Sequence, residues 1–443
     1  MINDQGQSPE ERFVGLDFRV GADFARKMDE EDELAAFREE FVFNDPDLIY
    51  MDGNSLGRLP ARALGHVRAI IEKEWGNDLI RGWNAGWYEA PARVGEKIAN
   101  LIGAGPGQVI VSDSTSVNLF KLIMAALEMR AERRRVVSDV LNFPSDVYIM
   151  RGCLRLVESR VGSNSPYQLD LVPSADGITV DLGAVRDAID ERTALVSLSH
   201  VVFKSGHLYD AAAVTEWAHQ AGALVLLDLS HSVGAVPIEL DRWGVDMAVG
   251  CTYKYLNGGP GAPAFLYVSH ELQEEALSPI WGWFGERAPF AFDLEYTPAE
   301  GISRFLVGSP PVLSLLAMEA GLDLQLEAGM QRIRDKSIGL TSYLVYLFDE
   351  ILAPLGFTLG SPRNPARRGS HISIRHPEGY RINRALIEEM RVLPDFRAPD
   401  NIRLGLAPLY TSFSEIWEAV ERIREVIERR LYRKYSTERL PVT

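Results

Sequence analysis

The sequence predicts an α/β fold, in which a large domain has a mainly parallel sheet with crossover helices and a smaller domain is α+β. Between residues 108 and 268, short apolar runs alternate with stretches of helical periodicity, which is typical of strand–helix–strand units. Runs such as 223–227 are apolar throughout, as strands are when both faces of a parallel sheet are covered. After residue 328, a long helix leads into the strands and helices of the second domain.

The N-terminal residues 1–60 are expected to contribute to the small domain and to a loop at the functional site. Residues 1–20 are polar and predict a mobile arm. Residues 29–41 predict an amphipathic helix with an acidic first turn, which Asp45-Pro46 ends. A short strand at 48–51 leads into a Gly/Asn turn, and Pro60 begins a helix to about residue 75.

The large domain is expected to span residues 61–327 and the small domain residues 328–443. Large-domain strands are predicted at 108–112, 135–140, 169–172, 194–198, 223–227, 245–250 and 262–268, and helices at 92–102, 113–130, 145–158, 181–190, 211–220 and 312–326. In the small domain, helices are predicted at 329–352, 381–391 and 412–430, and strands at 357–360, 371–375 and 401–406.

Composition restricts the classes of partner and location. The 443 residues are 46% hydrophobic and 24% charged, which is ordinary for a globular protein with a large core. A net charge of −16 argues against a nucleic-acid partner. Two cysteines form no disulfide framework, and the eight scattered histidines show no metal-ligand spacing. The N-terminus is not a signal peptide, and no run approaches the roughly 18 apolar residues that span a bilayer, so we expect a cytoplasmic protein without a membrane partner.

Asp228 and Lys254, each following a predicted strand, indicate the kind of chemistry that the protein performs. Asp228 ends the run 223–227, and Lys254 follows the run 245–250. Carboxyl ends of strands are where open α/β sheets bind ligands. Pyridoxal phosphate (PLP) requires a lysine that forms a Schiff base and an acid that keeps its pyridine nitrogen protonated. Considered alone, an Asp at a strand end is often a helix cap or a loop residue, and a single Lys is usually a solvated surface charge.

Other polar and aromatic residues follow strands of the same sheet. Ser116 lies at a strand-to-helix turn, where backbone N–H groups bind anions, although such residues also serve as helix caps. Phe143 follows a strand and suits either stacking on a flat ring or core packing. Arg403 lies in an apolar strand and needs a partner, either a substrate carboxylate or an internal acid.

At these residues the sequence resembles the kynureninase family. The resemblance is carried by MDGNSLG at 51–57, DLSHSVGAVP at 228–237 and WGVDMAVGCTYKYLNGGPG at 243–261, and it extends from about residue 29 to about 430. It implies a PLP-dependent enzyme of fold type I that hydrolyses L-kynurenine to anthranilate and L-alanine by Cβ–Cγ cleavage. It also implies a role in tryptophan catabolism and NAD biosynthesis, and a homodimer with shared active sites.

The resemblance also implies residue roles. Lys254 would carry the cofactor and Asp228 would pair with its pyridine nitrogen. Tyr253 would either move a proton or bind the cofactor phosphate. The other cofactor-binding residues would be Thr115, Ser116, Phe143, Ser145, Asp146, Ser199 and His231, with Trp283 and Ser309 from the partner subunit. The substrate would be bound by Asn54, Ser55, Trp83 and Arg403. Trp83 and Ser309 favour kynurenine over 3-hydroxykynurenine.

Two other readings remain open at this point. The first is another class V enzyme of fold type I, either an aminotransferase or a cysteine desulfurase-like lyase. A desulfurase needs a nucleophilic cysteine on a mobile loop, and neither Cys153, in a predicted helix, nor Cys251, beside the lysine, suits that role. The second is a partner-binding protein that keeps the fold without the chemistry, which the presence of Lys254, Asp228 and Arg403 disfavours.

Overall fold

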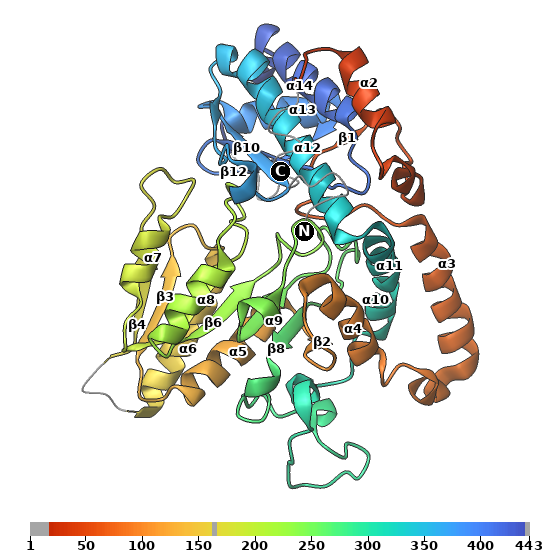
Figure 1. The fold of residues 1–443 in the computed structure, drawn as a ribbon. Helices are drawn as coiled ribbons and strands as arrows, with labels where there is room; N and C mark the ends of the chain where they lie inside the picture. The colour runs from red at the N-terminus through yellow and green to blue at the C-terminus, as the bar shows by residue number, and fades with distance from the viewer. Residues whose placement is uncertain (1–16, 162–165, 439–443) are drawn as a thin grey trace.

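The computed structural model describes residues 17–161 and 166–438. Most of the arm expected at residues 1–20 therefore lies outside the described residues. Figure 1 shows a large lower domain around one sheet and a smaller upper domain that includes both the C-terminal elements and the N-terminal helix α2 (Ala22–Glu30).

The large domain is built on a seven-stranded sheet with the order β2-β8-β7-β6-β5-β3-β4. β4, β3, β5, β6 and β7 are parallel, and β8 runs antiparallel to both β7 and β2. This arrangement confirms the predicted mainly parallel sheet. The strands are β2 (Val109–Val111), β3 (Arg135–Asp139), β4 (Gln168–Val172), β5 (Thr193–Ser199), β6 (Leu224–Asp228), β7 (Met247–Gly250) and β8 (Phe265–Val268).

Helices cover both faces of this sheet, so its central strands are buried throughout. Along β6, Val225 and Leu227 join one apolar cluster, whereas Leu224 and Leu226 join the other. This alternation follows from the period of two in a strand. The covering helices are α4 (Ala90–Ile102), α5 (Thr115–Met129), α6 (Pro144–Val161), α7 (Leu182–Ala188), α8 (Ala211–Gln220) and α9 (Leu240–Trp243).

The small domain combines an antiparallel sheet of order β12-β13-β10-β9 with three helices. Its strands are β9 (Thr358–Leu359), β10 (His371–Arg375), β12 (Asp395–Arg397) and β13 (Asn401–Gly405), and its helices are α12 (Met330–Leu347), α13 (Gly379–Met390) and α14 (Phe413–Glu428). α14 begins with a capping box between Ser412 and Glu415.

The N-terminal segment packs into the small domain. Ala25 and Met28 of α2 belong to the same apolar cluster as the inner faces of α12 and α14. The strand β1 (Ile49–Tyr50) pairs in parallel with β11 (Val392–Leu393). These contacts join α2 and β1 to elements of the small domain, while the predicted division into residues 1–60, 61–327 and 328–443 stays a prediction.

Several predicted elements were wrong or displaced. The helix expected at 29–41 is absent, because α2 ends at Glu30 and only the 3-10 turn Ala35–Glu40 follows. Asp29 instead accepts backbone hydrogen bonds from Phe413 and Ser414, so its carboxylate serves the start of α14. The helix expected at 312–326 is divided into α10 (Val312–Ala317) and α11 (Glu319–Ala328). β11 and β12 were not predicted at all.

Elsewhere the differences are smaller. The helix expected from Pro60 is α3 (Ala61–Ala69), which continues as a π-helix (Ile70–Asp78) before the 3-10 turn Leu79–Ala85. Among the described residues, the stretch Met330–Leu355 is long and apolar enough by length and composition to cross a membrane, which the sequence analysis did not anticipate. Half of its apolar window is buried inside the protein, as in the core helix of a domain.

Candidate active site

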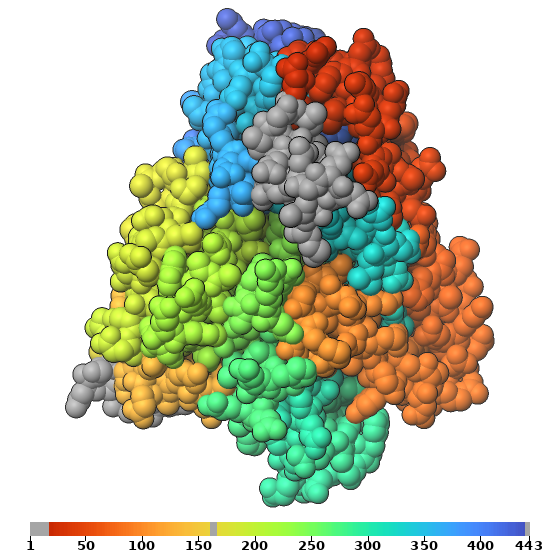
Figure 2. All heavy atoms as spheres, viewed as in Figure 1, coloured from red at the N-terminus to blue at the C-terminus, as the bar shows by residue number. Residues whose placement is uncertain are grey.

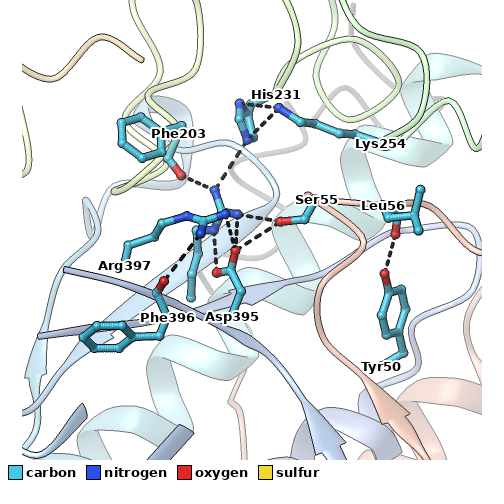
Figure 3. A network of polar contacts seen from close by, with 10 residues as sticks. Tyr50, Ser55, Leu56, Phe203, His231, Lys254, Asp395, Phe396 and Arg397 are labelled. Carbon is cyan, nitrogen blue, oxygen red and sulfur yellow. Dashed lines mark hydrogen bonds and ion pairs between the residues drawn. The ribbon is translucent and has the colours of Figure 1, made fainter. Parts of the chain in front are cut away.

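Lys254 lies where the sheet presents the ends of its central strands. Ser199 at the end of β5 and Asp228 at the end of β6 are paired neighbours, and Lys254 follows β7. The Lys254 Nζ lies 3.2 Å from Nε2 and 3.4 Å from Nδ1 of His231 (Figure 3). Burial, and next the charge of Lys254, hold the pKa of His231 well below its usual value, so this imidazole is neutral. The structure thus brings Lys254 and His231 together, while their roles in binding a cofactor stay a prediction.

Asp146 and Asp228 form a buried pair of acids beside this lysine. Asp146 is 4% exposed and Asp228 is 8% exposed. Burial, followed by the neighbouring charge of Asp228, raises the pKa of Asp146 well above its usual range. Asp228 is held by a hydrogen bond of 2.6 Å from the Ser230 backbone N–H to its Oδ1. A buried carboxylate beside a second carboxyl group is able to accept a hydrogen bond from a protonated ring nitrogen of a ligand.

Two serines predicted to bind the cofactor, Ser116 and Ser145, come together at two helix N-termini. Ser116 in the first turn of α5 and Ser145 in the first turn of α6 have their hydroxyl oxygens 3.2 Å apart. The cap of α5 is Ser114, which accepts from the Val117 N–H, so Thr115 and Ser116 are not used for capping. Free N–H groups at a helix start favour an anion such as a phosphate.

Phe143 and Ser199 lie on neighbouring strand ends. The Phe143 ring is 41% exposed and meets Phe203 edge-on at 5.1 Å between centroids. A ring exposed to this extent is available for stacking rather than being core. Ser199 donates to the Asn142 side-chain oxygen at 2.7 Å.

Arg403 is fully buried, and its partners include Ser55 and Asp395, which are labelled in Figure 3. Its Nε and Nη2 donate to the two oxygens of Asp395 at 2.9 and 2.5 Å. Nη2 also donates to the Ser55 hydroxyl at 2.7 Å. With its amide oxygen turned toward the guanidinium, Asn54 accepts from Arg403 Nε at 2.8 Å. The predicted residues Asn54, Ser55 and Arg403 therefore form one cluster.

Both readings of Arg403 are represented in this cluster. Asp395 supplies the internal acid that a buried arginine needs. The guanidinium also faces the Lys254 side of the site, since its Nη1 lies 3.5 Å from the His231 Nε2. Asp395 was missed by the sequence analysis because strand β12, which carries it, was not predicted. The short apolar run before the Arg397-Ala398-Pro399 turn was the available signal.

Tyr253 and Ser309 border a pocket of about 480 Å³ that also includes Ser114 and Gly261. The sulfur of Cys251 lies beside the Tyr253 hydroxyl, and this contact together with burial raises the pKa of the phenol. Tyr253 therefore remains protonated at neutral pH and is able to donate a hydrogen bond.

Trp83 and Trp283 are not brought to Lys254 within one chain. Trp83 packs on Trp87 and on Phe284, with ring centroids 5.8 and 5.4 Å apart. Trp283 also contacts Phe284, at 5.0 Å, and its indole N–H donates to the Pro289 carbonyl at 2.5 Å. The two tryptophans thus share one aromatic group around Phe284, and the roles predicted for them stay predictions.

Both cysteines are unsuited to nucleophilic chemistry. Cys153 in α6 and Cys251 after β7 are 1% and 2% exposed. Burial raises the pKa of the Cys153 thiol to about 12 and also raises that of Cys251. Within the part of the chain that the structure describes, no group of three or more His, Cys, Asp or Glu side chains is placed to hold a metal ion.

Comparison with known proteins gives the family. A family model described as the kynureninase C-terminal domain matches residues 333–423. A kynureninase from Pseudomonas fluorescens is 44% identical over 91% of this chain and 95% of that protein. The chain belongs to the kynureninase family. A kynureninase from Burkholderia pseudomallei (strain 1106a) is 42% identical over 92% of this chain and 96% of its own length.

Solved structures show that this kynureninase-family chain has the predicted fold type I. An apo cysteine desulfurase from Thermococcus onnurineus NA1 superimposes with a TM-score of 0.73 at 17% identity, covering 93% of this chain and 99% of that one. The K223A mutant of C-DES, with glycine linked to its PLP cofactor, also has a TM-score of 0.73, at 19% identity over 88% and 99% of the two chains. At these identities the likeness concerns the fold alone.

Proposed function

We propose that this chain is a PLP-dependent hydrolase that converts L-kynurenine to anthranilate and L-alanine by Cβ–Cγ cleavage. The observation that carries the proposal is the sequence of contacts from Lys254 through His231 to Arg403. A lysine able to carry the cofactor and a guanidinium able to bind a carboxylate are separated by one neutral imidazole. That arrangement suits an α-amino acid, whose amino group and carboxylate are attached to the same carbon.

The residues around Lys254 fit PLP. When bound, PLP supplies an electron sink that makes the α- and β-carbons of an amino acid reactive. Asp228 would hold a proton on the pyridine nitrogen, with Asp146 protonated beside it. Ser116, Ser145 and the start of α5 would bind the phosphate, and Phe143 would stack on the ring.

Each step of proton transfer has a candidate residue in the chain. The Lys254 amine would remove the proton from the substrate Cα and later return a proton to carbon. The protonated phenol of Tyr253 would donate toward the cofactor side of the substrate. Arg403 would hold the substrate carboxylate and so orient Cα toward Lys254.

We further propose a cytoplasmic homodimer whose partner subunit completes each site through Trp283 and Ser309. The support is the aromatic segment 281–296, in which Trp281, Phe290 and Phe292 are exposed by 66, 56 and 72%. The space-filling view shows that the segment 270–310 projects below the body of the large domain (Figure 2). Large apolar side chains exposed together are typical of an interface. Trp83 and Ser309 support kynurenine rather than 3-hydroxykynurenine as the preferred substrate, in tryptophan catabolism.

The test is direct. PLP-loaded protein is mixed with L-kynurenine, and anthranilate fluorescence is followed together with alanine, with 3-hydroxykynurenine in parallel. We expect anthranilate over many turnovers and a faster rate with kynurenine. Pyridoxamine phosphate formed once per site, without anthranilate, would instead support an aminotransferase. Protein that shows no visible absorption band after addition of PLP would contradict the role of Lys254.

A further inference from the structure

We propose that Asp395 is a positioning residue, which fixes the orientation of Arg403 so that one edge of its guanidinium faces Lys254 and binds the substrate α-carboxylate. This inference rests on the proposed function. It adds Asp395 of β12 to the site that contains Arg403 of β13. Asp395 itself does not contact the substrate, because Arg403 lies between it and His231.

Asp395 and Arg403 face each other across an antiparallel strand pair. They are paired neighbours in the register of β12 and β13. The Asp395 side chain is 5% exposed and the Arg403 side chain 2% exposed. Two parallel hydrogen bonds join Nε and Nη2 of the arginine to the two carboxylate oxygens. A fork of this kind restricts rotation of the guanidinium, which a single hydrogen bond would permit.

The fork fills one edge of the guanidinium, and the donors of the other edge have protein partners that a substrate carboxylate would replace. An arginine has five N–H donors, and the Nε–Nη2 edge is filled by Asp395. The other edge, formed by Nη1 and Nη2, faces Ser55 at 2.7 Å, the Phe203 carbonyl at 2.6 Å and His231 at 3.5 Å. Since His231 contacts Lys254, this second edge is the one that meets an amino acid bound near the lysine.

The charges around Asp395 favour an incoming carboxylate. Arg397, on the same strand as Asp395, contributes a second guanidinium at 2.7 Å from the Asp395 Oδ2. One carboxylate between two guanidiniums leaves an excess of positive charge. Asp52 also faces this group, but burial and the charge of Asp395 raise its pKa to about 7, so it only partly cancels that excess at neutral pH.

Asp395→Asn tests the proposal, with Asp400→Asn as the matched control. Asp400, in the turn before β13, also pairs with an arginine, Arg375 of β10 at 3.1 Å, in a more exposed position and with no recorded hydrogen bond or ion pair to Arg403. We expect Asp395→Asn to raise KM for L-kynurenine by roughly 10- to 100-fold, the effect of losing a hydrogen bond to a charged group, with a much smaller change in kcat. Asp400→Asn should leave both constants near the wild-type values.

A binding measurement separates positioning from a structural role. The dissociation constants of the holoenzyme for L-alanine and for ethylamine, which lacks the carboxylate, are measured by calorimetry. The preference for L-alanine is the dissociation constant for ethylamine divided by that for L-alanine. In Asp395→Asn we expect this ratio to fall by the same factor by which KM for L-kynurenine rises. If both ligands weaken equally, or if kcat alone falls, Asp395 is structural and the proposal is wrong.

A second variant covers the case in which Asp395→Asn does not fold. Asp395→Glu keeps the charge but displaces the carboxylate by one methylene, so it should also reduce the preference for L-alanine, by a smaller factor. An unchanged preference in Asp395→Glu, with Asp395→Asn unfolded, would reject the proposal. The L-alanine measurement needs no turnover, so it remains informative if the wild-type protein makes no anthranilate and the proposed function fails.

Discussion

The Lys254 amine lies against the ring of His231, 3.2 Å from Nε2 and 3.4 Å from Nδ1. The same Nε2 is 3.5 Å from the Nη1 of Arg403. A neutral imidazole between the lysine and the arginine separates the two side chains without adding a charge of its own. His231 thereby sets the spacing between the proposed cofactor lysine and the proposed carboxylate anchor.

Lys254→Ala is expected to abolish the reaction. Without the amine no group is placed to take the proton from Cα, and general base catalysis alone contributes roughly 10²- to 10⁴-fold. The measurement is anthranilate release, together with the visible absorption of the protein mixed with PLP. Lys27→Ala, on the exposed surface of α2, is the control and should retain the wild-type rate. Substantial turnover by Lys254→Ala would reject its assigned role.

The two buried acids should respond unequally to amide substitution. Burial and the neighbouring Asp228 raise the pKa of Asp146 well above its usual range, which favours its neutral form, so Asp146→Asn is the milder change of charge. Asp228→Asn removes the charge that would hold a proton on the pyridine nitrogen. We expect the second change to lower kcat by roughly 10²- to 10⁴-fold, with PLP still on Lys254, and the first to have a much smaller effect. Equal losses in the two variants would contradict this division of roles.

The buried imidazole of His200 should make the fold sensitive to acid. Burial lowers the pKa of His200 to about 3, against about 6.5 for an unfolded chain. Between these two pH values the unfolded state binds more protons than the folded state. The contribution of His200 to the free energy of unfolding is therefore fully present above pH 6.5 and falls as the pH is lowered. At pH 5 the loss from this group is about 2 kcal/mol.

The measurement is the free energy of unfolding at pH 7 and pH 5, by urea denaturation. In the wild type the free energy of unfolding falls between pH 7 and pH 5. His200→Gln should make this fall smaller by about 2 kcal/mol, whatever the stability of the variant at pH 7. His270→Gln, at an exposed histidine, is the control and should keep the wild-type difference. Burial raises the pKa of Asp139 to about 6, so this group stabilises the folded state as the pH falls, opposite to His200. The effect is the same in the wild type and both variants and cancels in the comparison. An identical pH dependence in His200→Gln and wild type would count against the assignment.

The exposed aromatic segment should control association. Phe292→Asp places a charge on a side chain that is 72% exposed, next to Trp283 with ring centroids 6.2 Å apart. We expect this change to shift the protein from dimer toward monomer in sedimentation velocity and to lower activity, because Trp283 would no longer reach a partner's site. Tyr148→Asp, at a similarly exposed residue of α6, should remain dimeric. A monomeric wild-type protein would reject the shared site.

Much of the large domain could be predicted because its signals are local. Continuous apolar runs identify β5, β6 and β7, since strands buried on both faces carry apolar residues at successive positions. The ends of these runs identify Ser199, Asp228 and the position of Lys254. α8 was predicted with its observed bounds, Ala211–Gln220.

The segment 29–41 shows why other elements could not be predicted. Its composition favours a helix, but Asp29 is used by the backbone of Phe413 and Ser414, which are far away in the chain. Asp32 likewise pairs with Lys336 of α12 at 2.6 Å. Interactions between distant segments outweigh helix propensities of a few tenths of a kcal/mol per residue.

The sequence alone determined the family, the approximate positions of the large-domain strands and the identity of the residues with reactive groups. Only the tertiary structure decided which of them meet: Asp146 with Asp228, His231 with Lys254, and Asp395 with Arg403. It also left Trp83 and Trp283 on a separate aromatic group. The physical reason is that side-chain charge, burial and hydrogen bonding depend on neighbours in space, whereas strand periodicity depends on neighbours along the chain.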